Sequence, residues 1–347
     1  MTNRCTIVSP SGNLYGSEQV LFDFLVGTGE VYTVMVPAGS LLLRKLQEAR
    51  LAHRLKTFRT GSPLRLYAGI FFQLAAGRIR TLYLNEAGHS RYAVMLARWY
   101  RKKNFVIHVR MKEDTEPGRW PSHPLPNLRL IAISGYIEHR LPLPAECILD
   151  PYRFTDRPLR AAKIDSSGLT IGVIGRITVT KGLYKLVQLA EHAAKDPAAA
   201  RLRFALFGDV SGDSEDRELV GRLQALPNVK FEGFVSDKDA IYDNLDAVLH
   251  MSVVEALGRI FFEAIDYGKP FLGFDAAGIG EIARLTGLDR GLAAADGDWM
   301  DKLLQRLLLL DREYGQWAEE VRNKKEACRN IFSMDRYVSR INALIAS

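Results

Sequence analysis

The sequence lacks several features that would place it in a common class of protein. It has only three cysteines, Cys5, Cys147 and Cys328, whose wide spacing fits neither a zinc site nor a disulfide framework, so we expect reduced thiols and a cytoplasmic setting. The longest apolar run, 66–77, contains Gln73 and is too short to span a membrane. No basic segment followed by an apolar core opens the chain, so we expect no secretory signal. The sequence therefore favours a globular protein without a membrane-spanning segment.

The charge of the chain is divided unevenly along its length. The 347 residues carry a net charge of +7, and the hydrophobic content of 47% is enough for two cores, so we expect two domains. Residues 1–150 contain 20 Lys and Arg against 11 Asp and Glu, a balance of +9, whereas residues 151–347 contain 27 against 29, a balance of −2. No recognition helix, zinc finger or stacking motif accompanies the positive charge, so we expect no nucleic-acid partner.

Part of this positive charge is interleaved with apolar residues, a pattern that suits contact with anionic lipid headgroups at a membrane surface. A helix face exposed to solvent explains the same pattern, and both interpretations stay open. The cations are Arg44, Lys45, Arg50, Arg54, Lys56, Arg59 and Arg65, and the apolar residues are Leu64, Tyr67, Phe71 and Phe72.

Short apolar runs alternate with helical patterns along the whole chain. This alternation predicts an α/β protein with parallel sheets that are covered by helices on both faces. The polar, proline-bearing stretch 151–167 reads as a linker between a domain of residues 1–150 and a domain of residues 168–331. The predicted strands include residues 6–9, 31–36, 81–84, 105–109, 130–133, 169–174, 204–207, 247–251 and 271–274.

Two glutamates, Glu255 and Glu263, lie at one predicted strand-to-helix junction. The apolar run 247–251 precedes them as a strand, and helical spacing follows Gly258, so Glu255 falls in the loop and Glu263 in the first helical turns. Open α/β sheets bind ligands at this edge, and the backbone N–H groups at a helix N-terminus suit a phosphate. By itself the pair is also compatible with a solvated helix face.

A second motif, Gly175-Arg176-Ile-Thr-Val-Thr-Lys181-Gly182, follows the predicted strand 169–174. It therefore places two cations at a carboxyl edge of the same sheet. Arg offers a planar fork for two phosphate oxygens and Lys a compact charge, so the pair suits a diphosphate. A solvent-exposed turn with two surface cations is the alternative.

Together these motifs resemble the donor site of family 4 glycosyltransferases, which are retaining enzymes with the GT-B fold. The resemblance is strongest from Gly168 to about Glu281. It implies two Rossmann-like domains with a cleft between them, and a C-terminal helix within 332–347 that packs back on the first domain. The chain departs from the family pattern at Ala277, where a glycine is usual, and at Leu257, where an aromatic residue is common.

The resemblance also implies roles for individual residues. Arg176, Lys181, Gly258 and Arg259 would hold the donor diphosphate, and Glu263 would hold the ribose. Glu255 would orient the sugar in the catalytic site. Leu257 would lie in the sugar pocket, and backbone groups near Val235 would bind the nucleobase, although residues 228–235 also read as an ordinary strand end.

Two residues of the first domain belong to the same resemblance. Gly16 lies in a loop expected under the donor phosphates, with Ser17 as a cap for the following helix. His108 ends the strand 105–109 where the family keeps a histidine near the transferred sugar. A lone histidine in that position is otherwise a structural residue.

The implied activity is transfer of a sugar from a nucleotide-sugar donor to a hydroxyl of a glycan or lipid-linked acceptor, as in bacterial surface polysaccharide or lipopolysaccharide assembly. A non-catalytic scaffold that binds sugar nucleotides and a GT-B epimerase remain alternatives. No cofactor is expected. We expect no metal either, because helix capping explains the two Asp-x-Asp matches, Asp237 with Asp239 and Asp296 with Asp298.

Overall fold

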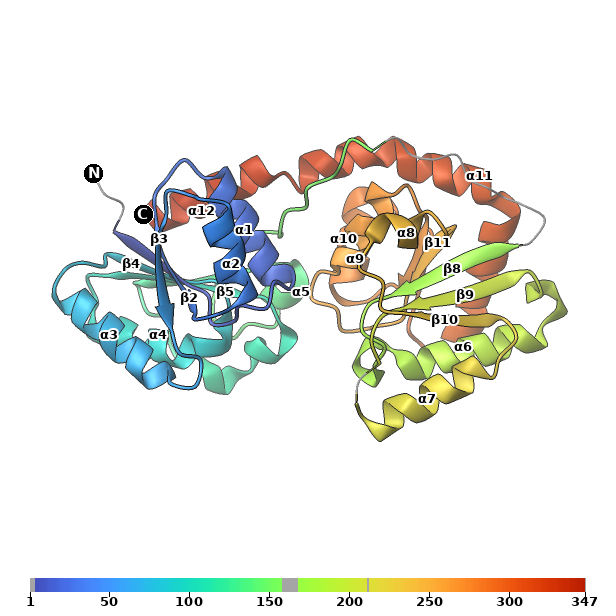
Figure 1. The fold of residues 1–347 in the computed structure, drawn as a ribbon, viewed down its shortest axis with the longest axis horizontal. Coiled ribbons are helices and arrows are strands. Elements are labelled where there is room, and N and C mark those ends of the chain that lie inside the picture. Colours follow the sequence, from blue (N-terminus) through green and yellow to red (C-terminus); the bar gives the residue numbers. More distant parts are fainter. Residues whose placement is uncertain (1–3, 158–167, 211, 347) are drawn as a thin grey trace. The chain divides into compact units, whose positions relative to one another are not determined.

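The computed structural model describes residues 4–157, 168–210 and 212–346, which form two compact units. Unit 1 comprises residues 1–153 and 332–347, and unit 2 comprises residues 154–331 (Figure 1). Of the predicted linker 151–167, residues 158–167 lie outside the described residues. A cleft between the two domains stays a prediction.

Unit 1 contains a fully parallel sheet in the order β3-β2-β1-β4-β5-β6-β7. Its strands and helices are β1 (Cys5–Val8), α1 (Gly16–Gly27), β2 (Thr33–Pro37), α2 (Leu41–Glu48), β3 (Arg54–Phe58), α3 (Pro63–Ala75), β4 (Thr81–Leu84), α4 (Ser90–Trp99), β5 (Asn104–Val109), β6 (Leu128–Ala132), α5 (Gly135–Glu138), β7 (Ala145–Cys147) and α12 (Met334–Ala346).

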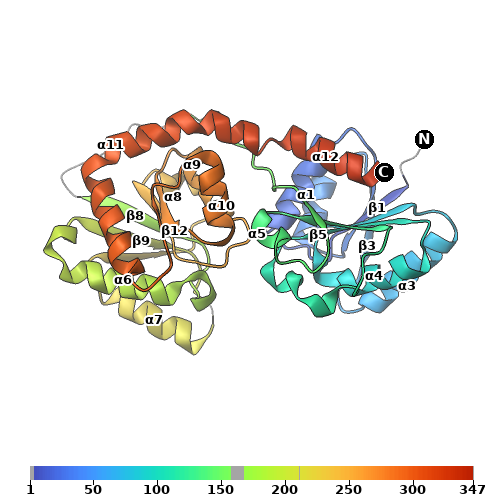
Figure 2. The same cartoon turned by 180° about the vertical axis from the view of Figure 1, so that it is seen from behind.

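The C-terminal helix α12 packs on α1 in unit 1 (Figure 2). Tyr337, Val338, Ile341 and Ile345 recur at helical spacing and enter the same buried cluster as Phe24 of α1. The ring of Tyr337 meets that of Phe24 edge-on, with centroids 6.3 Å apart. The terminal segment is therefore part of the core of unit 1.

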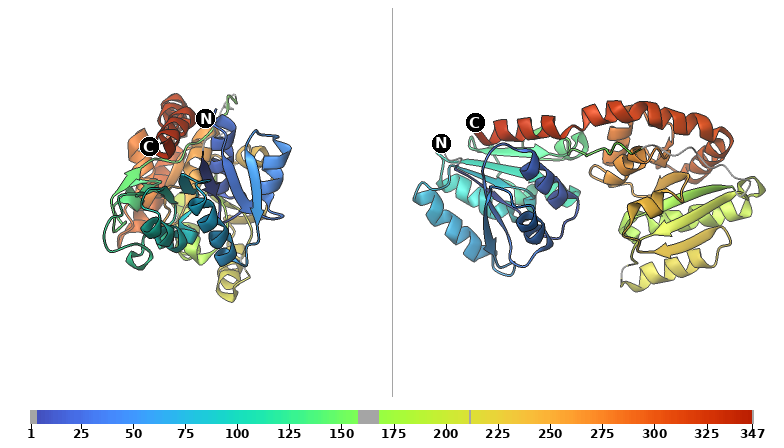
Figure 3. Two further views of the ribbon diagram at one scale, coloured as in Figure 1. Left: turned by 90° about the vertical axis from the view of Figure 1, so that its left-hand side faces the viewer. Right: turned by 45° about the horizontal axis from the view of Figure 1, so that its top comes forward.

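Unit 2 contains a second parallel sheet, in the order β10-β9-β8-β11-β12-β13. Helices α6 and α7 lie on one face of it, and α8, α9 and α10 lie on the other (Figures 1 and 3). The elements are β8 (Leu169–Ile174), α6 (Leu183–Lys195), β9 (Leu202–Phe207), α7 (Ser214–Gln224), β10 (Val229–Gly233), α8 (Lys238–Tyr242), β11 (Ala247–His250), α9 (Arg259–Asp266), β12 (Phe271–Phe274), α10 (Ala277–Thr286), β13 (Leu292–Ala293) and α11 (Trp299–Ile331).

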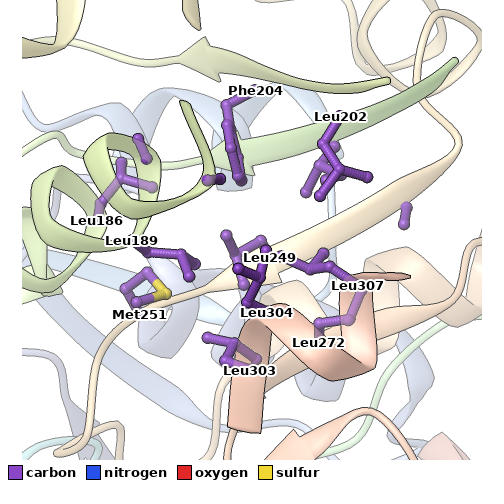
Figure 4. Packing of buried hydrophobic residues seen from close by; sticks show 14 of the residues in the cluster. Leu186, Leu189, Leu202, Phe204, Leu249, Met251, Leu272, Leu303, Leu304 and Leu307 are labelled. Atoms are coloured by element: carbon purple, nitrogen blue, oxygen red, sulfur yellow. The ribbon is translucent and has the colours of Figure 1, made fainter. Parts of the chain in front are cut away.

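Leucines from two helices and from the strands form the core of unit 2 (Figure 4). Leu186 and Leu189 of α6 and Leu304 and Leu307 of α11 belong to one buried cluster with Leu249 of β11. Burial of these apolar side chains is the main favourable term for folding. Because this packing holds β8 and β11 in register, it also fixes where their loops begin.

Candidate functional site

The order of strands in unit 2 reverses direction between β8 and β11. From β8 the chain adds β9 and β10 on one side, and it then returns to place β11, β12 and β13 on the other. Loops that leave two such strands diverge and open a space at the carboxyl edge, where ligands of open α/β sheets bind. Both sequence motifs lie here, because residues 175–182 follow β8 and residues 251–258 follow β11.

A pocket of about 180 Å³ lies at this point, and we call it the β8/β11 pocket. It brings together residues that are far apart in the sequence. Five of the predicted donor-site residues line it, namely Arg176, Lys181, Glu255, Gly258 and Arg259.

Two glycines let the loops around the pocket approach closely. Gly182 has a φ of +88°, and a Cβ on it would lie 2.2 Å from the carbonyl oxygen of Met251. Gly258 has a φ of +87°, and a Cβ there would lie 2.1 Å from Ile279. A side chain at either position would therefore both strain the backbone and clash. Gly182 thus allows the neighbouring Lys181 to lie against the end of β11, beside Glu255.

Glu255 is held in an electrostatic cluster inside the pocket. Lys181 Nζ donates a hydrogen bond of 2.7 Å to Glu255 Oε2, and His250 Nε2 lies 3.6 Å from the same oxygen. Burial alone would raise the pKa of Glu255, but His250 and the charge of Lys181 outweigh it and lower that pKa to about 2. Glu255 is therefore ionised at neutral pH.

Arg176 supplies a charge that the protein does not neutralise. Its side chain is exposed and forms no hydrogen bond or ion pair among the residues that the structure describes. No side chain caps the N-terminus of α9, because the N-cap residue is Gly258. An exposed guanidinium beside a helix N-terminus suits an anionic ligand.

His250, the last residue of β11, was missed by the sequence analysis. Its side chain is only 11% exposed, and its Nε2 atom is buried without a hydrogen-bond partner among the described residues. The sequence feature that could have identified it is its position, because it is a polar residue at the end of an apolar strand, and ligands of open α/β sheets bind at the carboxyl ends of the strands. Its nearest charged neighbour is Glu255.

Glu263 and Val235 lie outside the β8/β11 pocket and beside α8. Lys238 Nζ donates to Glu263 Oε1 at 2.6 Å, and the Tyr242 hydroxyl donates to Oε2 at 3.2 Å. Val235 lines a separate pocket of about 710 Å³, to which Ala240 of α8 also contributes. The structure thus places both residues around one short helix.

Leu257 lies inside the protein rather than on a pocket wall. The residue is only 3% exposed, so its side chain is not available to contact a donor. The backbone N–H of Gly278 donates to Glu255 O at 2.8 Å and holds this loop against α10. Ala277, the departure from the family pattern, has a φ of +51°, which is the left-handed conformation that glycine adopts without strain.

In unit 1, Gly16 is the first residue of α1, and the expected cap at Ser17 is wrong. The helix begins two residues earlier than that cap requires, with Tyr15 at the N-cap and no side-chain cap. Because Ser17 already has a helical backbone, its hydroxyl donates to Glu18 Oε2 at 3.0 Å instead.

His108 is completely buried inside unit 1. Arg110 Nη2 donates to His108 Nδ1 at 3.1 Å, and the Tyr83 hydroxyl lies 2.9 Å from the same atom. Its ring stacks on Tyr337, and Arg110 pairs with Asp150. Burial and the charge of Arg110 hold the pKa of His108 well below its usual range. A contact with a sugar hydroxyl requires movement of these neighbours, and it stays a prediction.

An acid pair at the corresponding edge of unit 1 was also missed. The strand order reverses between β1 and β4, and Glu18 and Glu86 follow those two strands. Burial, and after it the neighbouring Glu18, raises the pKa of Glu86 to about 7. The sequence feature that could have identified the pair is that each glutamate follows a predicted strand, at the carboxyl edge of the same sheet.

The aspartates of the two Asp-x-Asp matches have partners in the protein. Asp237 caps α8 by accepting the N–H of Asp239 at 2.9 Å, as predicted. Lys302 pairs with Asp296 at 2.8 Å and with Asp298 at 3.4 Å. Among the described residues, no group of three or more His, Cys, Asp and Glu is placed to hold a metal ion.

Comparison with known proteins gives one family match and several structural ones. Residues 157–324 match the family model of the glycosyl transferases group 1. No curated protein matches the chain significantly.

The solved structures similar to this chain cover almost its whole length. Anabaena Alr3699/HepE in complex with UDP superposes with a TM-score of 0.75 at 17% identity over 99% of both chains. A glycosyltransferase from Rickettsia africae ESF-5 gives 0.72 at 15% identity, over 99% of this chain and 98% of that chain. The lipopolysaccharide outer core galactosyltransferase WaaB in its apo form gives 0.71 at 13% identity over 98% of both. The fold is therefore that of the GT-B glycosyltransferases.

Proposed function

We propose that the chain is a glycosyl transferase of group 1, the family whose model matches residues 157–324, and that within it the chain is a family 4 retaining enzyme that works without a metal ion. It moves a sugar from a nucleotide-sugar donor to a hydroxyl of a glycan or lipid-linked acceptor. Its setting is the cytoplasmic side of bacterial surface polysaccharide assembly. The observation that carries the proposal is the β8/β11 pocket, where Arg176, Lys181, Arg259 and a helix N-terminus converge at the reversal of the sheet.

The diphosphate of the donor binds in the β8/β11 pocket. Arg176 grips two phosphate oxygens through its planar fork, while Lys181 neutralises charge and the N-terminus of α9 donates backbone N–H groups. Once the donor is bound, these groups are oriented toward the diphosphate before the bond to the sugar breaks. Negative charge that develops on the departing diphosphate is stabilised without reorganisation of the protein, which is the largest single contribution in many enzymes.

Glu255 has two functions in this mechanism. Without a donor it neutralises Lys181 across their 2.7 Å hydrogen bond. When the donor phosphate pairs with Lys181, the carboxylate of Glu255 is free to accept hydrogen bonds from hydroxyls of the sugar. These bonds orient the anomeric carbon of the sugar. Its low pKa keeps it an acceptor at neutral pH. Binding of the donor thus releases the group that positions the donor's sugar.

The nucleoside extends from the pocket toward α8. Glu263 accepts hydrogen bonds from the ribose hydroxyls in place of, or beside, those from Lys238 and Tyr242. Backbone groups at Val235 bind the base. The acceptor hydroxyl then attacks on the face from which the diphosphate leaves and gives its proton to the phosphate, so that no protein nucleophile is needed. This last step follows from the resemblance to the retaining family.

The first test is a thermal shift screen with UDP, GDP, ADP and CDP. A ligand that binds only the folded state raises the melting temperature, and we expect UDP to give the largest rise because the similar HepE structure holds UDP. Arg176→Ala should remove most of that rise, whereas Arg217→Ala, at an exposed residue of α7 that lines neither pocket, should retain it. If no nucleotide stabilises the protein, or if Arg176→Ala responds like the wild type, the proposed donor site is refuted.

Product analysis then tests transfer against the two alternatives. Nuclear magnetic resonance of a reaction with donor and acceptor should show a new glycosidic bond with the donor's anomeric configuration. Isomerised nucleotide sugar in the absence of an acceptor would identify an epimerase. Binding without either product, and without slow hydrolysis of the donor, would identify a scaffold.

A further inference from the structure

Helices α3 and α4 lie side by side on one face of the sheet of unit 1 (Figures 1 and 2). Aromatic contacts join them: Tyr67 stacks on Tyr92 with ring centroids 4.8 Å apart, and Phe71 meets Trp99 edge-on at 5.6 Å. The Tyr100 hydroxyl also donates to Phe71 O at 3.1 Å. The two helices therefore present one rigid outer surface.

Large apolar side chains stand on this surface. Leu64, Phe72 and Trp99 are 69%, 68% and 64% exposed, and Met95 is also exposed. In contrast, Tyr67 of α3 is buried. We call the exposed side the α3/α4 face. Tryptophan and phenylalanine are typical of surfaces that enter the headgroup region of a bilayer.

Cations surround these apolar side chains, and acids are almost absent from this part of the sequence. Residues 49–112 contain 14 Lys and Arg but a single acidic residue, Glu86, which is half-buried and follows β4 at the carboxyl edge of the sheet. The exposed cations of α3, α4 and the turn after α4 form no ion pair among the residues that the structure describes. They are Arg65, Arg91, Arg98, Arg101 and Lys102.

A basic pocket of about 420 Å³ adjoins the C-terminal end of α3. Arg54 and Lys56 of β3 line it together with Arg78, and no acidic residue does so. Arg54 and Lys56 lie on a strand. For these two residues, the sequence-based explanation of a solvent-exposed helix face is therefore wrong. The pocket has the charge and size to receive a phosphate group next to Ala76, the C-cap residue of α3.

We propose that the α3/α4 face docks the protein on an anionic lipid bilayer, with lipid phosphate held in the basic pocket at the end of α3. No helix in the described part of the chain is long and apolar enough to cross a membrane, so the contact is with the surface. Apolar side chains enter the headgroup region while the cations bind anionic lipid. The inference stands independently of the proposed transfer reaction, although it suits a lipid-linked acceptor.

Sedimentation with vesicles tests the inference directly. The full-length protein should sediment with vesicles that contain phosphatidylglycerol and remain in solution with vesicles of phosphatidylcholine alone. Binding should weaken as salt is added, because screening reduces the attraction between exposed charges. The double variant Arg98→Glu with Lys102→Glu should lower the partition coefficient roughly thirtyfold or more.

Matched variants in unit 2 serve as controls. Arg217→Glu with Arg312→Glu changes the net charge by the same amount at two exposed residues and should bind vesicles like the wild type. Phe72→Ser should weaken binding, whereas Leu285→Ser, at an exposed leucine of α10, should not. Intact melting temperatures and unchanged binding of UDP would show that folding and the donor site survive.

Two outcomes would overturn the inference. One is equal binding of the wild type to both kinds of vesicle. The other is binding to phosphatidylglycerol vesicles that Arg98→Glu with Lys102→Glu and Phe72→Ser leave unchanged. A third outcome would also overturn it: the wild type binds an RNA oligomer as tightly as the vesicles, and Phe72→Ser does not weaken the binding to RNA. The face would then bind polyanions in general and not a lipid surface.

Discussion

The two units share a topology but differ in the chemistry at the edge where their strand order reverses. In unit 2 this edge carries exposed Arg176 and the cluster of Lys181, His250 and Glu255. In unit 1 it carries the acid Glu86, whose pKa is raised to about 7. The same doubly wound sheet thus offers positive charge in one unit and a partly protonated acid in the other.

This difference shows how one fold can serve two kinds of ligand. A cationic edge with a helix N-terminus suits a diphosphate, whereas an acid beside other acids repels one. A carboxyl group that is neutral part of the time suits uncharged hydroxyls. We therefore assign the donor phosphates to unit 2, and the predictions below test that division from the largest expected effect to the smallest.

Replacing Glu255 with glutamine should have the largest effect. The substitution removes the charge that orients the sugar but leaves Lys181 free for phosphate, so turnover should fall about 100-fold while the affinity for UDP is kept or improved. Steady-state kinetics and calorimetry measure the two quantities. Glu319→Gln, at an exposed residue of α11, should change neither. Unchanged turnover in Glu255→Gln would remove this residue from the site.

Glu86→Gln should change the pH dependence of stability. The unfolded carboxyl has the ordinary pKa of 4.5 and the folded one about 7, so the contribution of Glu86 to the free energy of unfolding should fall as the pH rises from 4.5 to 7. Buried His108, whose pKa is lowered, contributes in the opposite direction in both proteins, so the wild type is compared with the variant at each pH. The fall should be about 2 kcal/mol and should be missing in the glutamine variant. Denaturation at a series of pH values measures it.

The acid of unit 2 provides the contrast for that experiment. Because the pKa of Glu255 is depressed to about 2, its contribution to stability is complete above pH 4.5 and is lost only as the pH falls below that value. Glu255→Gln should therefore keep the wild-type slope between pH 4.5 and 7. A difference in the free energy of unfolding between the wild type and Glu86→Gln that stayed constant over this interval would contradict the raised pKa of Glu86.

Lys181→Ala should weaken the binding of UDP about tenfold, because one charge-assisted hydrogen bond to phosphate is lost. The variant also leaves Glu255 without its main cationic partner. Isothermal titration calorimetry gives the affinity, and Lys195→Ala, at the exposed end of α6, is the matched control. Equal affinities in both variants would show that the diphosphate does not contact Lys181.

Ala277→Gly should have the smallest effect. Ala277 has a φ of +51°, so glycine relieves strain of about 1 kcal/mol, part of which is offset by the greater freedom of glycine in the unfolded chain. We expect stability to rise by less than about 1 kcal/mol, as measured by chemical denaturation. A loss of stability would show that the side chain of Ala277 contributes packing that outweighs the strain.

The sequence was sufficient for the parts of the fold and site that depend on local pattern. The strand before Arg176 and the strand before Glu255 were recognisable as apolar runs, and the structure confirms both as β8 and β11. Because carboxyl ends of parallel strands share an edge, the two motifs could be placed together. The short strands β3, β7 and β13 were not predicted, since their residues lack a continuous apolar run.

Other features depend on contacts that one sequence does not reveal. His108 is buried because Tyr337, from the other end of the chain, stacks on its ring. The α3/α4 face was anticipated only in α3, because the exposure of Trp99 depends on how α4 packs against Phe71. The pairing of Glu263 with Lys238 likewise depends on the placement of α8.

A crystal structure of the protein with UDP tests the central claim most directly. The account predicts the diphosphate in the β8/β11 pocket, with Arg176 and Lys181 on its oxygens, the N-terminus of α9 directed at it, and Glu255 turned from Lys181 toward the space for the sugar. A diphosphate bound at the edge of unit 1, beside Glu86, or in the separate pocket next to Val235 would contradict the account.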